Sequence, residues 1–428
     1  MQNMKANTMK QVLKSSLLAT LAVVASGALT ACNRFAGPTS LSQRPLLNAQ
    51  TRAPRPATYV SGQVVVQFRS RPNPAFLQQF SQQYGLQPMR VSPMGSVLFR
   101  QLNRSASTQS VMQSLSRSSM VEFSHPNRLY RRFFTVNDPR SSEQSGLAVI
   151  GSSKAWDITM GSPNVTIAVI DSGADLQHPD LLPNLVPGYN VISQGQTPPQ
   201  DDNGHGTHAS GIAAAAGDNR IGIAGACPRC KLMPIKALDA QGSGTGFDVA
   251  VGVVWAIENG ATIINMSLGG EESDPTLERA VKYALSRNVA VVVAAGNNAT
   301  DVPMYPAALP GVISVGSVTT NQTRSDFSNF GRWVSVMAPG SGILSTMPMG
   351  PVFMTTNEGY RNEYDLMDGT SMAAPMVAGV VGLIRSRHPN LTPAQIKARL
   401  EGTAIDLGTP GFDTEFGHGM IDAFRSVL

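Results

Sequence analysis

The chain has 428 residues, enough for one large hydrophobic core and a second, small domain. Its formal net charge of +5 hides an uneven distribution, because residues 1–134 carry a net charge of +15 and residues 135–428 a net charge of −10. The basic overall balance therefore does not indicate nucleic-acid binding, and no stretch resembles a nucleic-acid-binding motif.

Residues 1–31 have the pattern of an export signal rather than of a folded domain. Three lysines precede an apolar run from Leu17 to Ala31, which is too short and too rich in small residues for a membrane-spanning helix. The run ends in Leu29-Thr30-Ala31-Cys32, which resembles a bacterial lipobox and predicts lipidation of Cys32. An ordinary signal peptide followed by an incidental cysteine is the alternative. Lipidation would hold the exported precursor at the cell envelope.

The next two segments differ in composition. Residues 32–57 are rich in Pro, Ser, Arg and Asn, which predicts a tether. In residues 58–134, strand-like segments (63–68, 97–99 and 121–123) alternate with helix-like segments (74–84 and 108–116). This order predicts a small α+β domain, whose basic surface would be attracted to the acidic remainder of the chain.

From residue 135 to residue 428, short apolar strands alternate with helical segments. Strands are predicted at 166–170, 232–235, 262–266, 289–293 and 312–315, and helices at 249–258, 275–287, 373–387 and 393–401. The alternation predicts an α/β domain with a doubly wound parallel sheet that is covered by helices on both faces.

The first strand of this domain ends in Asp171, which is followed by Ser172 and Gly173. Catalytic and ligand-binding groups of open α/β sheets gather at the carboxyl ends of strands, so Asp171 is a candidate catalytic acid. Taken alone, it would be interpreted as an ordinary turn aspartate.

His205 lies between two glycines at the predicted start of a helix that continues to Ala216. His208 follows three residues later, but this spacing without a nearby acidic partner indicates a zinc pair only weakly. A general base is the better interpretation of His205.

Cys227 and Cys230 lie in a loop before a predicted strand. A redox motif or half of a zinc site is conceivable, but a zinc site would need other ligands because the chain has no second cysteine pair. In an exported chain, a local disulfide is favoured.

The segment Gly369-Thr370-Ser371-Met372-Ala373-Ala374-Pro375 places a serine where small residues lead into a helix. Unpaired N–H groups at a helix N-terminus favour developing negative charge. An ordinary tight turn with an N-capping serine is the alternative for this segment taken by itself. Together with Asp171 and His205, however, Ser371 completes a set of nucleophile, base and orienting acid.

The order Asp171, His205, Ser371 differs from that of α/β-hydrolases, which run Ser, acid, His and carry a G-x-S-x-G elbow. In combination, the three motifs resemble the subtilisin-like serine proteases (subtilases) over roughly residues 138–428. The resemblance implies a subtilisin-like fold and a secreted endopeptidase that cleaves proteins and peptides through an acyl-enzyme intermediate, with no cofactor in the chemistry. It also implies that residues 58–134 form a ferredoxin-like inhibitory propeptide, removed by self-cleavage between residues 131 and 137.

Further roles follow from the same resemblance. Asn297, at the end of an apolar strand, would donate its side-chain N–H to the oxyanion together with the backbone N–H of Ser371. Glycine-rich segments would form the groove edges, where free backbone groups pair with an extended peptide. The implied substrate-binding residues are Gly242, Ser243, Gly244, Ser267, Leu268, Gly269, Ala294, Gly296 and Met304. Alone, each of these glycine segments would be a simple loop or turn.

Met304 departs from the family pattern, in which many members have a small residue before the Tyr-Pro of this pocket. Its side chain would fill the pocket floor, so we expect a preference for smaller apolar side chains at the cleavage position.

Residues 217–223 interrupt the predicted helix of His205 and resemble the calcium-binding loop of the family. The implied ligands are side chains of Asp138, Asp180 and Asn219 and carbonyl oxygens of Gly217, Ile221 and Ile223. Hard oxygen ligands in a flexible cage suit Ca²⁺ rather than Mg²⁺. A polar helix terminus is the alternative, and the positive charge of Arg220 would lie nearby.

Two other functions compete with a general secreted protease. One is a lipid-anchored, peptide-binding pseudoenzyme, against which the intact set of Asp171, His205, Ser371 and Asn297 argues. The other is a processing protease with a single envelope substrate, which the groove motifs do not separate from general digestion. We expect a monomer whose mature catalytic domain is extracellular.

Overall fold

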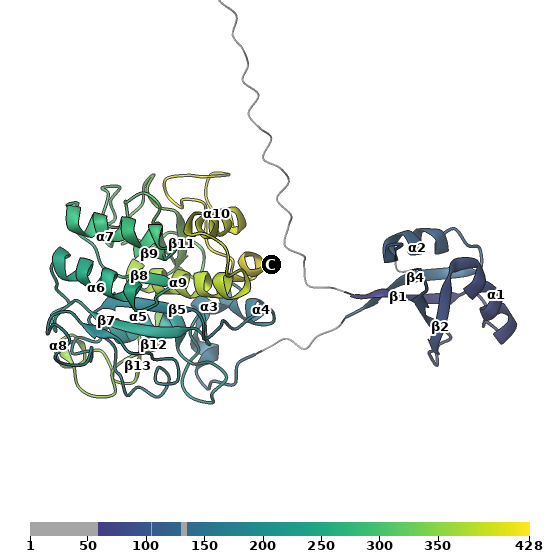
Figure 1. The fold of residues 1–428 in the computed structure, drawn as a ribbon, viewed down its shortest axis with the longest axis horizontal. Helices are drawn as coiled ribbons and strands as arrows, with labels where there is room; N and C mark the ends of the chain where they lie inside the picture. Colours follow the sequence, from purple (N-terminus) through teal and green to yellow (C-terminus); the bar gives the residue numbers. More distant parts are fainter. Residues whose placement is uncertain (1–58, 104, 130–134) are drawn as a thin grey trace, which may run out of the picture. The chain divides into compact units, whose positions relative to one another are not determined.

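A computed structural model describes residues 59–103, 105–129 and 135–428 of the chain. The predicted signal peptide, the tether, Cys32 and residues 130–134 of the expected processing region lie outside the described residues. Across the part of the chain that is described, no helix is long and apolar enough to span a membrane. The small N-terminal domain and the large C-terminal domain are described separately (Figure 1).

The N-terminal domain is a four-stranded antiparallel sheet with two helices. Its elements in chain order are β1 (Tyr59–Phe68), α1 (Pro74–Tyr84), β2 (Leu86–Val91), β3 (Val97–Gln101), α2 (Thr108–Leu115) and β4 (Val121–Arg128). The strand order β2-β3-β1-β4 gives the expected ferredoxin-like arrangement. Alternate residues of β1 point into a core in which Phe68, Phe80 and Phe99 pack against one another.

Two edge strands of this sheet differ from the prediction. Strand β2 was not predicted, because only its first residue, Leu86, is buried and the others carry no apolar alternation. Strand β4 runs on through Pro126, where we expected the strand to have ended. Proline is tolerated there because β4 lies at the edge of the sheet, where a missing N–H breaks no ladder.

The C-terminal domain is built on a seven-stranded, fully parallel sheet, which confirms the predicted fold class. The spatial order is β11 (Val336–Pro339), β10 (Ile313–Val318), β9 (Ala290–Ala294), β8 (Ile263–Met266), β5 (Thr166–Asp171), β7 (Lys231–Lys236) and β6 (Tyr189–Asn190).

Helices cover both faces of this sheet (Figure 1). Ile167 and Val169 of β5 belong to the core that includes α5 (His205–Ala214) and α9 (Thr370–Arg387). Ala168 and Ile170 face the other core, formed with α6 (Gly246–Glu258) and α7 (Pro275–Ser286). Burial on both faces explains why the central strands are continuous apolar runs in the sequence.

Smaller elements complete the domain. They are a 3₁₀ turn (Ser141–Glu143), α3 (Ser145–Val149), α4 (Ser152–Trp156), the antiparallel pair β12 (Ile343–Thr346) and β13 (Tyr364–Met367), α8 (Phe353–Asn357), α10 (Pro393–Thr403) and α11 (Ala423–Val427).

Both helices that carry candidate catalytic residues differ from the prediction at one end. Helix α5 ends at Ala214 instead of Ala216. Residues 217–223 therefore follow the helix as a loop and do not interrupt it. The N–H groups of Ala226 and Cys227 bond to the carbonyls of Ile212 and Ala213 in the last turn of α5, where the helix stops. Helix α9 begins at Thr370, so Ser371 lies inside its first turn.

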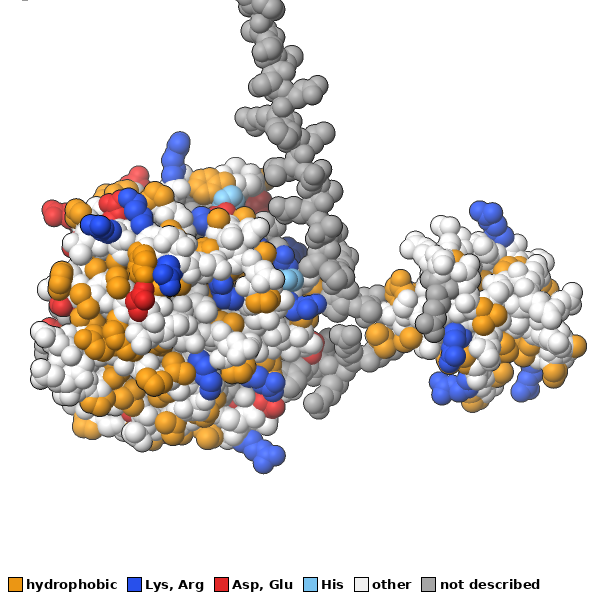
Figure 2. Space-filling model, viewed as in Figure 1, with side chains coloured by type: hydrophobic (Ala, Val, Ile, Leu, Met, Phe, Trp, Pro, Cys, Tyr) orange, Lys and Arg blue, Asp and Glu red, His pale blue; other side chains and the backbone are white. Residues whose placement is uncertain are grey.

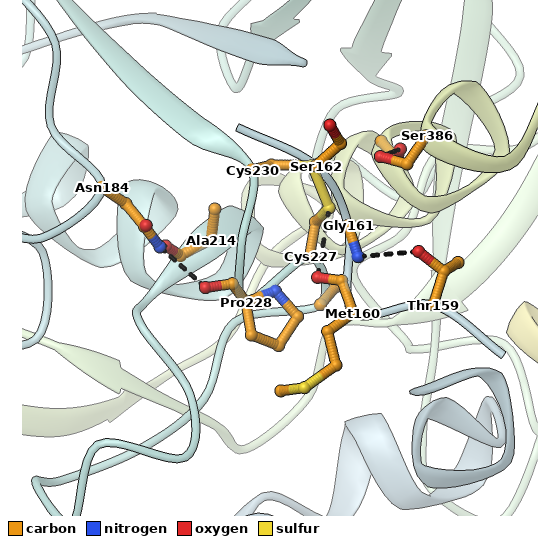
Figure 3. The surroundings of a disulfide bond; sticks show 12 residues. Thr159, Met160, Gly161, Ser162, Asn184, Ala214, Cys227, Pro228, Cys230 and Ser386 are labelled. Atoms are coloured by element: carbon orange, nitrogen blue, oxygen red, sulfur yellow. Dashed lines mark hydrogen bonds between the residues drawn. A yellow bond between two sulfur atoms is a disulfide. The ribbon is translucent and has the colours of Figure 1, made fainter. Parts of the chain in front are cut away.

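Cys227 and Cys230 are joined by a disulfide in the loop before β7 (Figure 3). Both cysteines are fully buried, and the backbone of Gly161 lies against them. A Cβ atom on Gly161 would be 2.3 Å from Cys227 Sγ, and one on Gly382 of α9 would be 2.8 Å from Cys230 Sγ. The disulfide therefore packs between two glycines, one of them in the helix that carries Ser371.

Candidate active site

Asp171 and His205 meet where β5 ends and α5 begins. The two oxygens of the buried Asp171 carboxylate lie 2.8 and 3.0 Å from His205 Nδ1. The N–H of Ser172 also donates to this carboxylate, at 2.8 Å. Gly204, with φ of +120°, provides the turn that starts α5 at His205.

The pKa of His205 reflects two opposing effects. Burial is the largest single effect and lowers the pKa of the imidazole, but the charge and the hydrogen bond of Asp171 together with other nearby charges raise the pKa above its usual value. The charges of Asp201 and Glu358 act in the same upward direction. A carboxylate on Nδ1 leaves Nε2 as the nitrogen that can exchange a proton with another group.

Ser371 is tied to the segment that follows β8. Its hydroxyl donates to the carbonyl of Ser267 at 3.2 Å, and the Ser267 hydroxyl donates to the carbonyl of Ser371 at 2.8 Å. Among the contacts of the described residues, no hydrogen bond joins Ser371 to His205. The structure thus brings the candidate acid and the candidate base together, whereas the candidate nucleophile bonds to the segment after β8.

Asn297 follows β9 and is oriented by the residue before Ser371. The N–H and the hydroxyl of Thr370 both donate to Asn297 Oδ1, each at 2.9 Å. Because its oxygen is held in this way, the amide Nδ2 is the free end of the side chain. A Cβ atom on Gly369 would lie 3.5 Å from both Asn297 Nδ2 and the backbone nitrogen of Ser371, so these two N–H donors flank one small space.

A cavity of about 790 Å³ lies between the N-terminal ends of α6 and α7. Five of the predicted groove residues line it, namely Gly242, Ser243, Gly244, Leu268 and Gly269. The acidic residues Glu272, Asp274 and Glu278 also line it. Its volume is large enough for several substrate side chains.

The other predicted groove residues lie outside the lining of this cavity. Ser267 contacts Ser371 as described, and Ala294 is the buried last residue of β9. Gly296 and Met304 are neighbours, because a Cβ atom on Gly296 would lie 3.1 Å from Met304 Cγ. Met304 therefore packs beside the loop of Asn297.

The residues expected to bind calcium lie together around the 217–223 loop. Asp138 accepts two backbone N–H groups of the loop, at 2.8 and 3.2 Å. Asp180 accepts the N–H of Ile223 at 2.8 Å, the hydroxyl of Tyr364 at 2.9 Å and the amide of Asn219 at 2.9 Å. Burial raises the pKa of both carboxyl groups, because it removes the water that would stabilise their charged forms.

The remaining expected ligands are backbone oxygens. Within the described residues, no donor pairs with the carbonyl oxygens of Gly217, Ile221 or Ile223. No cluster of three or more His, Cys, Asp or Glu side chains is placed to hold a metal ion in the described parts of the chain. A cation at this loop would therefore depend on carbonyl and amide oxygens besides the two carboxylates.

Sequence reasoning missed three residues that hold the site. Thr370 orients Asn297, and Ser172 and Asp201 join the end of β5 to the start of α5. The available signal for Asp201 was its position three residues before Gly204, the N-cap residue of α5, because acidic and amide residues are common at helix starts.

Comparison with known proteins decides the family. The model of the subtilase family, Peptidase_S8, matches residues 162–419. The chain belongs to the subtilase family. A model of the fervidolysin N-terminal prodomain matches residues 47–127, which overlaps the small α+β domain.

Individual subtilases match over most of their length. A thermophilic serine proteinase of Bacillus sp. strain AK1 is 37% identical over 370 residues, which is 86% of this chain and 88% of the relative. Thermitase of Thermoactinomyces vulgaris is 40% identical over 295 residues, covering 69% of this chain and 99% of thermitase.

Two solved structures have the same fold, each with a TM-score of 0.62. A protease of Pseudoalteromonas arctica PAMC 21717 is 32% identical, covering 69% of this chain and 99% of that protein. Fervidolysin of Fervidobacterium pennivorans, described as a keratinolytic enzyme related to subtilisin, is 28% identical, covering 87% of this chain and 62% of that protein. This subtilase is thus a subtilisin-like serine endopeptidase with a prodomain, consistent with a zymogen, and it acts on protein substrates.

Proposed function

We propose that this subtilase hydrolyses peptide bonds through an acyl-enzyme intermediate, with Ser371 as nucleophile, His205 as general base and Asp171 as the orienting acid. The observation that carries the proposal is the 2.8 Å contact between Asp171 and His205 Nδ1, which leaves Nε2 free to take a proton. Ser371 Oγ attacks the carbonyl carbon as its proton passes to Nε2, and the imidazolium is stabilised by Asp171.

The negative charge then develops on the carbonyl oxygen of the substrate. The Nδ2 group of Asn297 and the backbone N–H of Ser371 flank the space where such an oxygen would lie. The imidazolium next gives its proton to the leaving amine, which breaks the peptide bond. Water, activated by the same imidazole, attacks the acyl-enzyme and restores Ser371.

The substrate would bind as an extended peptide along the two glycine-containing segments that line the large cavity, Gly242–Gly244 and Leu268–Gly270. Met304, beside the loop of Asn297, would restrict the side chain at the cleavage position to small apolar groups. If Met304→Gly left the preference between Ala and Phe at this position unchanged, this role of Met304 would be wrong.

Labelling with a fluorophosphonate probe tests the function. We expect the mature enzyme to be labelled at Ser371 and to digest casein, whereas Ser371→Ala should lose both properties and His205→Ala should lose at least about 10³-fold in kcat. A well-folded wild-type protein that is neither labelled nor active would be a peptide-binding pseudoenzyme instead. Cleavage of a single envelope protein but not of casein would indicate a processing protease.

The prodomain acts in this proposal as an inhibitor that the enzyme removes itself between residues 131 and 137. Ser371→Ala should therefore remain full length, and N-terminal sequencing of the mature wild type should begin in this range. A mature start beyond Asp171 would contradict self-processing at the domain boundary.

A structural Ca²⁺ ion at the 217–223 loop belongs to the same proposal. Two buried carboxylates with raised pKa values and three unpaired carbonyl oxygens form a donor set of hard oxygens, which suits this ion. EDTA should lower the melting temperature, and CaCl₂ but not MgCl₂ should restore it. Asp180→Asn should weaken this response, and an EDTA-insensitive melting temperature would contradict the site.

We further propose export of a precursor lipidated at Cys32, an extracellular mature enzyme and a monomeric state. In the Ser371→Ala precursor, mass spectrometry should detect diacylglycerol on Cys32, and Cys32→Ser should abolish membrane fractionation. Release of the catalytic domain into the medium by wild type alone would show that self-cleavage frees the enzyme. Light scattering would test the monomer.

A further inference from the structure

Asp201 is a buried carboxylate that the catalytic steps above do not use. It is 2% exposed and lies in the loop just before α5. Its neighbour Asp202 pairs with Lys236 at 2.6 Å, whereas no cation pairs with Asp201 among the contacts of the described residues. A buried carboxylate without a cation must be stabilised by hydrogen bonds, so the question is which groups it holds.

Five donors converge on the Asp201 carboxylate. Oδ1 accepts the hydroxyl of Ser172 at 2.8 Å and the N–H groups of Asn203 and Gly204 at 3.0 and 2.9 Å. Oδ2 accepts the N–H of Thr207 at 2.9 Å and its hydroxyl at 2.6 Å. Both oxygens are therefore fully engaged, and three of the donors are backbone groups around His205.

These contacts connect the two elements of the catalytic acid and base. Ser172 directly follows Asp171 at the end of β5, and its hydroxyl accepts the N–H of Gly206, which directly follows His205, at 2.9 Å. The carboxylate thus fixes the start of α5 to the end of β5 on both sides of the imidazole. Its charge also lies at the positive N-terminus of the helix, where it is favoured.

Only a carboxylate satisfies all of these donors. An asparagine of the same shape would turn an NH₂ group towards either the N–H groups of Asn203 and Gly204 or the N–H of Thr207. Backbone N–H groups cannot act as acceptors, so at least one of them would stay unpaired in a buried position.

We propose that Asp201 is a positioning residue of the active site, which holds His205 in register with Asp171 through Ser172 and the first turn of α5. This inference rests on the proposed catalytic role of His205. Asp201 does not touch substrate, and it acts by fixing where the imidazole lies and by adding negative charge near it.

Several charged or titratable groups face His205, and they decide what a pH profile will show. Asp171 faces it from β5, Glu358 from the segment after α8, and His208 from α5 itself, besides Asp201. Asp171, Asp201 and Glu358 raise the pKa of His205. Removing the charge of Asp201 should therefore lower the pKa of the imidazole and move the acid limb of kcat/KM to lower pH.

The test compares Asp201→Asn with two further variants in the self-processed enzyme. Asp201→Asn should reduce kcat by about 10- to 100-fold with KM within threefold, and shift the acid limb to lower pH. Ser172→Ala keeps the charge but removes the bridging hydroxyl, so kcat should fall with the acid limb unmoved. Asp202→Asn removes the same charge from the neighbouring residue and serves as the control. Its kcat and the pH of its acid limb should equal those of the wild type.

Each outcome separates this inference from the proposed function. An inactive, unlabelled wild type would refute the proposed function itself. An active wild type with an Asp201→Asn variant of unchanged kcat and pH profile would overturn only the role of Asp201. A lower melting temperature with no shift of the acid limb would likewise overturn it, in favour of a purely structural role. If Asp201→Asn does not mature, Ser172→Ala decides, and wild-type kcat in that variant would overturn the proposal.

Discussion

The orientation of a single amide, that of Asn297, is fixed by one neighbouring threonine. Both donors of Thr370 occupy Asn297 Oδ1, so Nδ2 has to face the space beside Ser371. A side chain that donates only to a developing oxyanion stabilises the transition state and not the bound substrate.

Asn297→Ala should therefore lower kcat with little change in KM. We expect a loss of about 10²- to 10³-fold, by analogy with subtilisin, the family member in which the loss of such a donor was measured. Steady-state kinetics on a peptide anilide would measure it. Asn298→Ala removes the next amide along the chain and should behave as wild type, and equal losses in both variants would point to a disturbed loop instead.

His208 gives the fold a defined sensitivity to acid. Burial lowers the pKa of its imidazole to about 3, while Nε2 bonds to the carbonyl of Asp365 at 3.1 Å. Below the ordinary pKa of about 6.5, the imidazole of His208 binds a proton in the unfolded chain but stays neutral in the folded chain. The free energy of unfolding should therefore fall as pH drops from about 6.5 towards 3, by up to about 1.4 kcal/mol per pH unit.

Urea unfolding at pH 7 and pH 5 would measure this dependence, in the Ser371→Ala background to prevent autolysis. His208→Gln should flatten the slope between the two pH values, although some slope remains because burial also lowers the pKa of His178. An unchanged slope in His208→Gln would show that His208 is not the responsible group.

At the residue scale, sequence patterns located Asp171, His205, Ser371 and Asn297 because each lies in a compact motif at the end of a strand or the start of a helix. They did not locate Thr370 and Asp201 as supports. Thr370 contacts Asn297 across 73 positions of sequence, and Ser172 contacts Asp201 across 29. Only the folded chain brings such partners together.

At the scale of elements, burial decided which could be predicted. The central strands of the parallel sheet are apolar on both faces and were all predicted. The two-residue strand β6, the short edge strand β11 and the pair β12–β13 were not predicted. Their sequences are too short to show a period, and their pairing depends on tertiary contacts.

The disulfide loop gives a prediction at this scale. Gly161 has φ of +101° and faces Cys227 Sγ, whereas Gly260 has φ of +90° and would meet nothing within 4 Å. Gly260→Ala should lower the free energy of unfolding through backbone strain alone, by about 1–2 kcal/mol. Gly161→Ala should cost about 1–3 kcal/mol more, because its methyl group overpacks the disulfide.

Chemical unfolding of both variants in the Ser371→Ala background would measure the difference. Reduction of the disulfide should make the free energies of unfolding of the two variants more similar, because the separated sulfur atoms could move away from the added methyl group. Equal losses of stability under oxidising conditions would contradict the packing described here.

At the scale of the whole molecule, the division of charge is the dominant feature. Glu122 is the only acid in residues 1–134, and the small domain displays Lys and Arg side chains in Figure 2. Without the three lysines of the predicted signal peptide, residues 32–134 carry a net charge of +12, which attracts the net charge of −10 on residues 135–428. Salt weakens such attraction by shortening the Debye length from about 10 Å at 0.1 M to about 3 Å at 1 M.

After self-cleavage, release of the prodomain should therefore be faster at high salt. When the precursor activates in the presence of a peptide substrate, the lag before activity appears should be shorter in 0.5 M NaCl than in 0.05 M NaCl. The activity of enzyme that is already mature serves as the control for direct effects of salt. A lag that is independent of salt would mean that apolar contacts alone retain the prodomain.

The position of α9 has a consequence for when the enzyme can first cut. Ser371 lies in the first turn of α9, a helix of 18 residues that is buried along almost its whole length and follows all seven strands of the parallel sheet in chain order. In the proposed mechanism, a nascent chain in which Ser371 has not yet been synthesised therefore lacks its nucleophile. On this proposal, the order of the chain would delay proteolysis during synthesis, before the prodomain acts as an inhibitor.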